Sequence, residues 1–182
     1  MRRTTMVIVA LAWFQTAPLA AQPAAAPYAG REARAVKALS EQEARDLANG
    51  SGMGLAKAAE LNGYPGPRHV LDLAKELALT ADQARAIQEV HARMKDEAVA
   101  IGRSVLEREQ ALDRLFATRR IDEAQLALLT SEIGGLAGRL RAAHLKAHLE
   151  TTALLDQHQV RRYDQLRGYA VDAPGADGAH KH

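Results

Sequence analysis

The chain has no cysteine among its 182 residues, which excludes disulfides, thiolate metal ligands and a thiol nucleophile. Aromatic residues make up only 4% of the sequence, whereas alanine occupies 38 positions. Because alanine favours helix but buries little surface, the composition predicts a thin, elongated helical body and not a globule with a thick core.

Neither sign of charge dominates the sequence. There are 24 Lys and Arg residues against 22 Asp and Glu residues, and without Arg2 and Arg3 the two signs are equal. The doublets Arg119-Arg120 and Arg161-Arg162 have no aromatic residues interleaved with them. We therefore expect no nucleic-acid partner.

Common catalytic motifs are also missing. The sequence contains neither Gly-x-Ser-x-Gly nor His-Glu-x-x-His. The glycine-rich segment 50–54 does not follow a predicted strand, which a phosphate-binding loop requires. Carboxylates lie beside Arg and Lys at the spacing of solvated helix faces. We predict that the protein is not an enzyme.

Residues 1–21 have the layout of a secretory signal peptide. An arginine pair precedes an apolar run from Met6 to Phe14, and small residues follow up to Ala21. The run has about nine residues, far short of the roughly 20 that a membrane-spanning helix needs. Cleavage after Ala20 or Ala21 is therefore predicted, with an uncleaved anchor as the alternative.

The remaining chain divides into three parts. The Pro- and Ala-rich segment 22–30 lacks periodicity and predicts a flexible leader. Residues 31–169 have the periodicity of one helical domain, and residues 170–182 are predicted to be a disordered tail. Three short helices should open the domain: Ser40 to Leu47, Leu55 to Leu61, and His69 to Leu77.

Two long helical segments dominate the domain. Apolar residues recur at steps of three and four from Thr80 to a break at residues 118–121, and again in a returning helix that reaches about Leu154. A connection this short places the two helices antiparallel. A last helix runs from Gln157 to about Leu166. The predicted fold class is all-α, a long antiparallel helical hairpin with short N-terminal helices and a short C-terminal helix.

Such a hairpin has too few bulky side chains to cover its own apolar seam. The short N-terminal helices can cover part of the seam. A second copy of the chain is the natural candidate for the rest, so we expect a homodimer.

Two similar pentapeptides frame the long segments. Each has a leucine, a helix-capping residue and a glutamine three positions after the cap. The capping side chain accepts from the third backbone N–H of the helix, and the glutamine accepts from the cap's own N–H. The residues are Leu79, Thr80 and Gln83 in the first pentapeptide, and Leu155, Asp156 and Gln159 in the second.

These pentapeptides carry a family resemblance. The chain resembles the Spy/CpxP family of periplasmic proteins, whose signature is a pair of Leu-Thr-x-x-Gln motifs. Asp156 replaces threonine in the second motif but keeps the capping chemistry. Segments 61–71 and 162–166 also resemble a subgroup known as periplasmic heavy-metal sensor or resistance proteins.

The resemblance implies a helical hairpin that dimerises into a cradle in the periplasm. It also implies activities from ATP-independent holding of unfolded proteins to envelope-stress signalling and binding of nickel, cobalt, zinc or copper. In the metal-sensing branch the ligands include histidines near the mature N-terminus, whereas here no histidine precedes His69. Whether a membrane-bound signalling partner takes part is left open by the sequence.

A histidine cluster is the candidate metal site. His144 and His148 are four residues apart on the returning helix and therefore share a face. Folding the hairpin about residues 119–120 brings His91, Met94 and Glu97 close to them. The alternative interpretation is that these are partly exposed rim residues, with Met94 in the apolar seam.

Two hypotheses follow. The first is a periplasmic ATP-independent chaperone or envelope stress-response protein that holds unfolded clients and needs no cofactor. The second is a periplasmic heavy-metal sensor or metal-binding resistance protein that binds Zn, Ni, Co or Cu through His144, His148 and His91. A structural protein of the envelope with neither activity is the third possibility.

Overall fold

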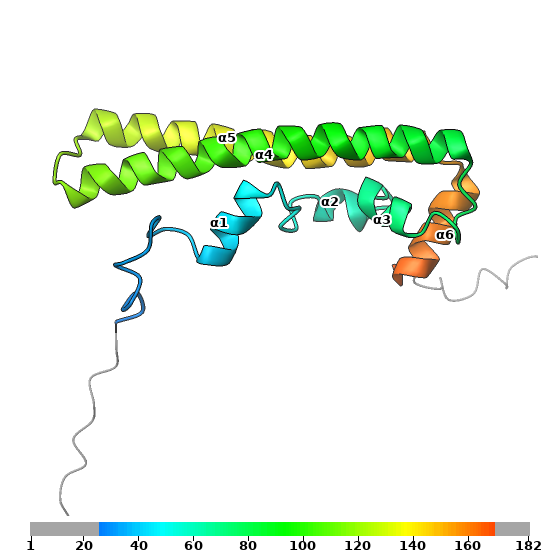
Figure 1. Ribbon diagram of the computed structural model, residues 1–182, viewed down its shortest axis with the longest axis horizontal. Helices are drawn as coiled ribbons and strands as arrows, with labels where there is room; N and C mark the ends of the chain where they lie inside the picture. The colour runs from blue at the N-terminus through cyan, green and yellow to red at the C-terminus, as the bar shows by residue number, and fades with distance from the viewer. Residues whose placement is uncertain (1–25, 170–182) are drawn as a thin grey trace, which may run out of the picture. The chain divides into compact units, whose positions relative to one another are not determined.

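The computed structural model describes residues 26–169, which fall into two units, residues 26–32 and residues 33–169. Within the described residues the structure is all-helical and contains no strand, which confirms the predicted fold class (Figure 1). The helices are α1 (Glu41–Ala48), α2 (Lys57–Glu60), α3 (Pro67–Asp72), α4 (Ala81–Ala117), α5 (Glu123–Ala153) and α6 (Gln157–Arg167). The predicted signal peptide and tail lie outside the described residues.

Helices α4 and α5 form the hairpin. Two ion pairs cross between them, Arg93 to Glu150 at 2.9 Å and Arg108 to Glu132 at 3.0 Å. These pairs follow the register expected for a fold about residues 119–120. Arg119 takes a positive φ of 54° in the turn, which reverses the chain within a few residues.

The N-terminal segment packs along α4 more than along α5. Helix α1 crosses α4 at Gly102, where a Cβ atom would lie only 2.0 Å from the carbonyl oxygen of Leu47. Glycine is therefore required for this close approach. Lys37, which precedes α1, forms an ion pair with Asp113 of α4 at 2.7 Å.

The second and third helices are shorter than predicted. Helix α3 begins at Pro67, whose missing N–H suits a first helical position. It ends at Asp72, and residues 73–78 form hydrogen-bonded turns that close with Ala78 at a positive φ of 50°. Apolar spacing alone does not distinguish such turns from a continuing helix.

The base of the hairpin, where α4 begins and α5 ends, is closed by α3 and α6. Its core contains Val70, Ile87 and Tyr163, each 0% exposed, with Leu77 at 3%. Leu79 and Leu155 of the two pentapeptides pack against this core. The C-terminal helix therefore seals one end of the molecule.

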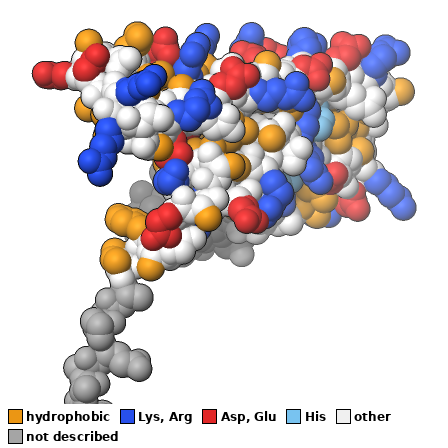
Figure 2. Space-filling model, turned by 60° about the vertical axis from the view of Figure 1, so that its left-hand side comes forward, with side chains coloured by type: hydrophobic (Ala, Val, Ile, Leu, Met, Phe, Trp, Pro, Cys, Tyr) orange, Lys and Arg blue, Asp and Glu red, His pale blue; other side chains and the backbone are white. Residues whose placement is uncertain are grey.

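Other parts of the hairpin remain open. Phe116, Leu128 and Leu149 are 53%, 59% and 57% exposed. At three glycines of α5, a Cβ would have no described residue within 4 Å: Gly134, Gly135 and Gly138. Figure 2 shows acidic and basic side chains intermixed over the face it presents, with apolar side chains between them. In the described part of the chain, no helix is both long and apolar enough to cross a membrane.

Candidate functional site

Both pentapeptides form the predicted capping boxes. The Thr80 hydroxyl accepts from the Gln83 backbone N–H at 3.1 Å, and the Gln83 side chain accepts from the Thr80 N–H at 3.0 Å. The Asp156 carboxylate and the Gln159 side chain make the corresponding bonds at 2.8 and 3.0 Å. These residues begin α4 and α6 respectively.

The two motif glutamines also bind each other. Gln83 Nε2 donates to Gln159 Oε1 at 2.9 Å, and Gln159 Nε2 donates to Gln83 Oε1 at 3.1 Å. Each amide nitrogen also donates to a backbone carbonyl, Gln83 to Leu154 at 2.9 Å and Gln159 to Leu77 at 3.2 Å. The pair therefore links the start of α4 to the start of α6. It also binds a carbonyl at the end of α5 and a carbonyl in the turns after α3, so the two glutamines have a structural role at the base.

A buried carboxylate, Glu60 of α2, forms a second cluster at this end of the hairpin. Glu60 is 8% exposed, and its Oε1 accepts from the Tyr163 hydroxyl at 2.5 Å and the Tyr169 hydroxyl at 3.3 Å. Arg167 Nε lies 3.4 Å from the same oxygen. Burial and the hydrogen bond to Glu60 raise the pKa of Tyr163, which keeps its hydroxyl protonated. No sequence pattern indicates this cluster, because Glu60 and Tyr163 are 103 positions apart.

The predicted metal-binding histidines line one cavity. His91, His144 and His148 surround a space of about 230 Å³ together with Met94. His69, which was not predicted, lines the same cavity because the turn at residues 62–67 brings it back to the hairpin. The proline-rich turn directly before His69 indicates that the chain reverses there, but it does not indicate that His69 meets the other histidines.

The surroundings of two imidazoles in this cavity bear on metal binding. His148 Nδ1 lies 2.7 Å from the Tyr64 carbonyl oxygen, which only accepts, so Nδ1 is protonated and donates. The same nitrogen lies 3.7 Å from Oε2 of the buried Glu60. Nε2 of the buried His144 has no hydrogen-bond partner among residues 26–169. Gly66 leaves room for the His148 ring, since a Cβ there would lie 2.8 Å from His148 Cε1.

Burial and nearby positive charge favour the neutral form of two of the cavity's histidines, His91 and His144. Burial lowers the pKa of His144 and of His91, and the ammonium of Lys95 lowers both further. Neutral imidazoles are the form that binds metal, but the same ammonium repels a cation. Within residues 26–169 no group of three or more His, Cys, Asp or Glu residues is arranged to hold a metal ion. Glu97 lines a different hollow, beside Arg93 and Lys146.

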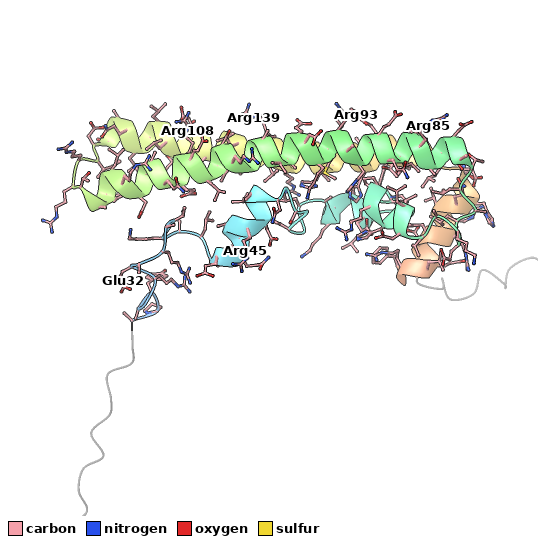
Figure 3. The ribbon with its side chains drawn as sticks, in the orientation of Figure 1. Glu32, Arg45, Arg85, Arg93, Arg108 and Arg139 are labelled. Carbon is pink, nitrogen blue, oxygen red and sulfur yellow. The ribbon has the colours of Figure 1, made fainter. Side chains whose placement is uncertain are left out.

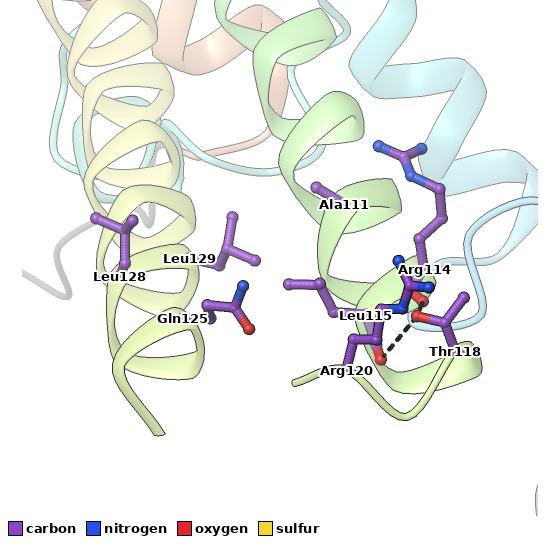
Figure 4. A pocket seen from close by; sticks show the side chains of 8 residues that line it. All are labelled: Ala111, Arg114, Leu115, Thr118, Arg120, Gln125, Leu128 and Leu129. Carbon is purple, nitrogen blue, oxygen red and sulfur yellow. Dashed lines mark hydrogen bonds between the residues drawn. The ribbon is translucent and has the colours of Figure 1, made fainter. Parts of the chain in front are cut away.

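A groove lies at the tip, where α4 ends and α5 begins. Its volume is about 410 Å³, and apolar side chains dominate its lining. The lining residues are Ala111, Arg114, Leu115, Thr118, Arg120, Gln125, Leu128 and Leu129. Figure 4 shows Leu115 of α4 and Leu129 of α5 projecting into the space between the helices.

Charged side chains accompany the apolar surface along the hairpin. Figure 3 shows Arg85, Arg93, Arg108 and Arg139 distributed over its length. Arg85 pairs with Asp82 at 2.6 Å within the first turns of α4. Apolar and charged side chains therefore alternate over the surface, an arrangement that suits weak, reversible contact with other chains.

Comparisons with family models, with curated proteins and with solved structures give no match. Membership of the Spy/CpxP family therefore stays a prediction that depends on the two pentapeptides.

Proposed function

We propose that the protein is a periplasmic, ATP-independent chaperone of the envelope stress response that holds unfolded clients. The observation that carries this proposal is the exposed apolar surface of the hairpin. Phe116 and Leu128 near the tip are more than half exposed, and Leu128 lines the apolar groove there, although the chain has a closed core at its base. Exposed apolar patches on a water-soluble surface usually mark a binding site.

Charge explains how holding would remain reversible. Cross-helix ion pairs and unpaired surface charges border the apolar side chains, so a bound client would stay hydrated and the complex soluble. No nucleotide is needed, because weak apolar contacts form and break on their own.

A second copy of the chain is part of this proposal. The open side of α5 at Gly134, Gly135 and Gly138 has no neighbour in the described residues, and glycines permit close approach of another backbone. Light scattering coupled to size exclusion is expected to give twice the mass of the chain. Replacing Gly135 and Gly138 by Glu should then convert the dimer to a monomer. A monomeric wild-type protein removes this part of the proposal.

Holding is tested by aggregation of a reduced, unfolding client followed by light scattering. The purified protein is expected to suppress scattering without ATP at a few-fold molar excess. The double variant Phe116→Ser/Leu128→Ser should suppress it much less, since both side chains are exposed and their loss leaves the closed core intact. Absence of suppression by the wild type would reject the proposed function.

Metal binding is the second candidate function, favoured by the state of two imidazoles. In metal sites a ligating histidine usually donates its other N–H to a carbonyl or carboxylate. His148 makes this bond to Tyr64, and the buried His144 Nε2 lacks a partner in the same cavity. Zn, Ni, Co or Cu would suit imidazole ligands with the nearby thioether of Met94.

Calorimetric titration with each of the four metals tests this candidate. We expect His144→Gln/His148→Gln to abolish binding, and Lys95→Met to strengthen it by removing the repelling ammonium. The exposed His158 provides the control substitution, His158→Gln, which should leave the titration unchanged. Equal affinity in the wild type and the double variant excludes this site.

A further inference from the structure

The groove at the hairpin tip combines an apolar lining with basic side chains. Ala111 and Leu115 contribute from α4, and Leu128 and Leu129 from α5. A volume of about 410 Å³ lies within the range of sites that bind small ligands or a few side chains of a peptide, roughly 300 to 1,000 Å³. The open rim leaves a path for a chain to enter from solvent.

Two arginines line this groove without a partner. Neither the Arg114 nor the Arg120 guanidinium has a hydrogen bond or ion pair to another described residue. No Asp or Glu belongs to the lining. By contrast, Arg93 and Arg108 further along the hairpin each pair with a glutamate of α5. A guanidinium beside an apolar surface, without an internal carboxylate, complements a carboxylate brought by a ligand.

We propose that the tip groove binds apolar peptide segments that carry a carboxylate next to their apolar residues. The apolar side chains would occupy the space between Leu115 and Leu129, and the carboxylate would bind Arg114 or Arg120. This inference deepens the proposed function and rests on it, because it names the class of client segment that the hairpin selects.

The charges around the groove favour a peptide over an anionic membrane. Asp122 and Glu123 begin α5 beside the turn, and both are exposed. A uniformly anionic surface large enough to cover the tip would face these carboxylates as well as the arginines. A single carboxylate on a peptide reaches the arginines without that repulsion.

Fluorescence anisotropy with labelled 12-residue peptides tests the inference. Three peptides share a Leu-Phe-Leu centre and differ only in flanking residues, which are Asp, Asn or Lys. The wild type is expected to bind the Asp peptide tightest and the Lys peptide weakest, with the difference reduced by added salt. Equal binding of the Asp and Asn peptides by the wild type would overturn the proposal.

Variants assign the preference to the groove. Arg114→Gln/Arg120→Gln should weaken binding of the Asp peptide roughly threefold to tenfold, as expected for two surface charge contacts, and leave the Asn peptide unchanged. The control Arg103→Gln/Arg141→Gln removes two exposed, unpaired arginines of the same helices and should leave both peptides unchanged. If the control variant loses as much affinity for the Asp peptide, the result contradicts a role of the groove.

Leu128→Ser adds a second, charge-independent test. It should weaken all three peptides by a similar factor, because it removes apolar lining and no charge. Binding to vesicles of phosphatidylglycerol and phosphatidylcholine is measured separately. If the protein binds these vesicles but not the Asp peptide, the proposal is overturned.

The holding assay separates the two proposals. If the wild type suppresses aggregation but shows no preference for the Asp peptide, the groove inference fails and the chaperone proposal stands. If the Asp peptide binds through Arg114 and Arg120 but aggregation is unaffected, the groove stands and the chaperone proposal fails.

Discussion

The two ends of the hairpin differ in how they are closed. At the base, Val70, Ile87 and Tyr163 are 0% exposed, and paired glutamines link the starts of α4 and α6. At the tip, Phe116 and Leu128 are more than half exposed. Elements from both ends of the sequence meet at the base, whereas α5 has an uncovered side toward the tip. Leu61 and Leu149 near the base are also more than half exposed, so the two ends differ in having or lacking an enclosed core and not in exposing single apolar side chains.

The largest effect is expected from opening the base. Tyr163→Ala should lower the free energy of unfolding by about 3 to 5 kcal/mol, because it removes a fully buried ring and leaves Glu60 without its closest donor. Urea denaturation followed by circular dichroism measures the change. Leu128→Ala at the tip is the control and should change the same quantity by no more than about 0.5 kcal/mol. Equal losses at both ends would contradict the comparison.

Replacing a glycine by alanine should lower the stability where the hairpin is covered by α1 and raise it on the open side of α5. Gly102→Ala forces a Cβ against the Leu47 carbonyl and should cost about 1 to 3 kcal/mol as α1 shifts. Within a single chain, a Cβ at Gly135 meets nothing within 4 Å of the described residues, so Gly135→Ala should raise the stability of the monomer by about 0.5 to 1 kcal/mol, measured at a protein concentration at which the dimer is dissociated. Thermal unfolding of the two variants measures both effects. A stabilising Gly102→Ala would show that α1 does not pack there.

The glutamine pair predicts coupling at the base. Gln83→Ala and Gln159→Ala should each cost about 1 to 2 kcal/mol, and the double variant should cost less than the two effects added together. Gln125 makes a capping box at the start of α5 without a glutamine partner. Gln125→Ala is therefore expected to cost less than about 1 kcal/mol. If the double variant loses as much stability as the two single variants added together, Gln83 and Gln159 are not coupled.

A smaller effect is expected from pH. Burial lowers the pKa of His144 below its ordinary value of 6.5. At a pH between the lowered pKa and 6.5, the unfolded chain therefore binds a proton that the folded chain does not. Stability should therefore fall as pH drops below about 6.5 and level off once pH passes the lowered pKa. In the presence of a chelator, His144→Gln should flatten this decline between pH 7 and pH 5. If the stability of His144→Gln falls with pH as steeply as that of the wild type, the result contradicts this role of His144.

Much of the fold follows from local sequence signals. Ser40, Thr80, Asp122 and Asp156 each form a capping box with a residue three positions later, so four helix starts were predictable from short segments. The apolar spacing and the short turn at residues 118–121 predicted the hairpin. The end of α2 was predicted to within one residue, whereas α3 ends at Asp72 and not at Leu77, because apolar spacing does not distinguish hydrogen-bonded turns from a continuing helix.

The candidate sites depend on distant contacts and were predicted only in part. The register of the hairpin brought His91 to His144 and His148, as expected, but His69 joins them through a turn whose direction no local signal specifies. Glu60 and Tyr163 are separated by 103 positions, and neither belongs to a periodic motif that indicates the other. The tip groove likewise could not be predicted, because only the folded chain shows that the side chains of Arg114 and Arg120 line it without a partner among the described residues.

The most direct test is hydrogen exchange of the protein with and without an unfolded client. A bound client is expected to add protection at the tip, over residues 111–129, and to leave exchange unchanged at the base around Tyr163, where the core is already closed. Protection confined to the base, or no added protection at the tip while the client is bound, would contradict this prediction.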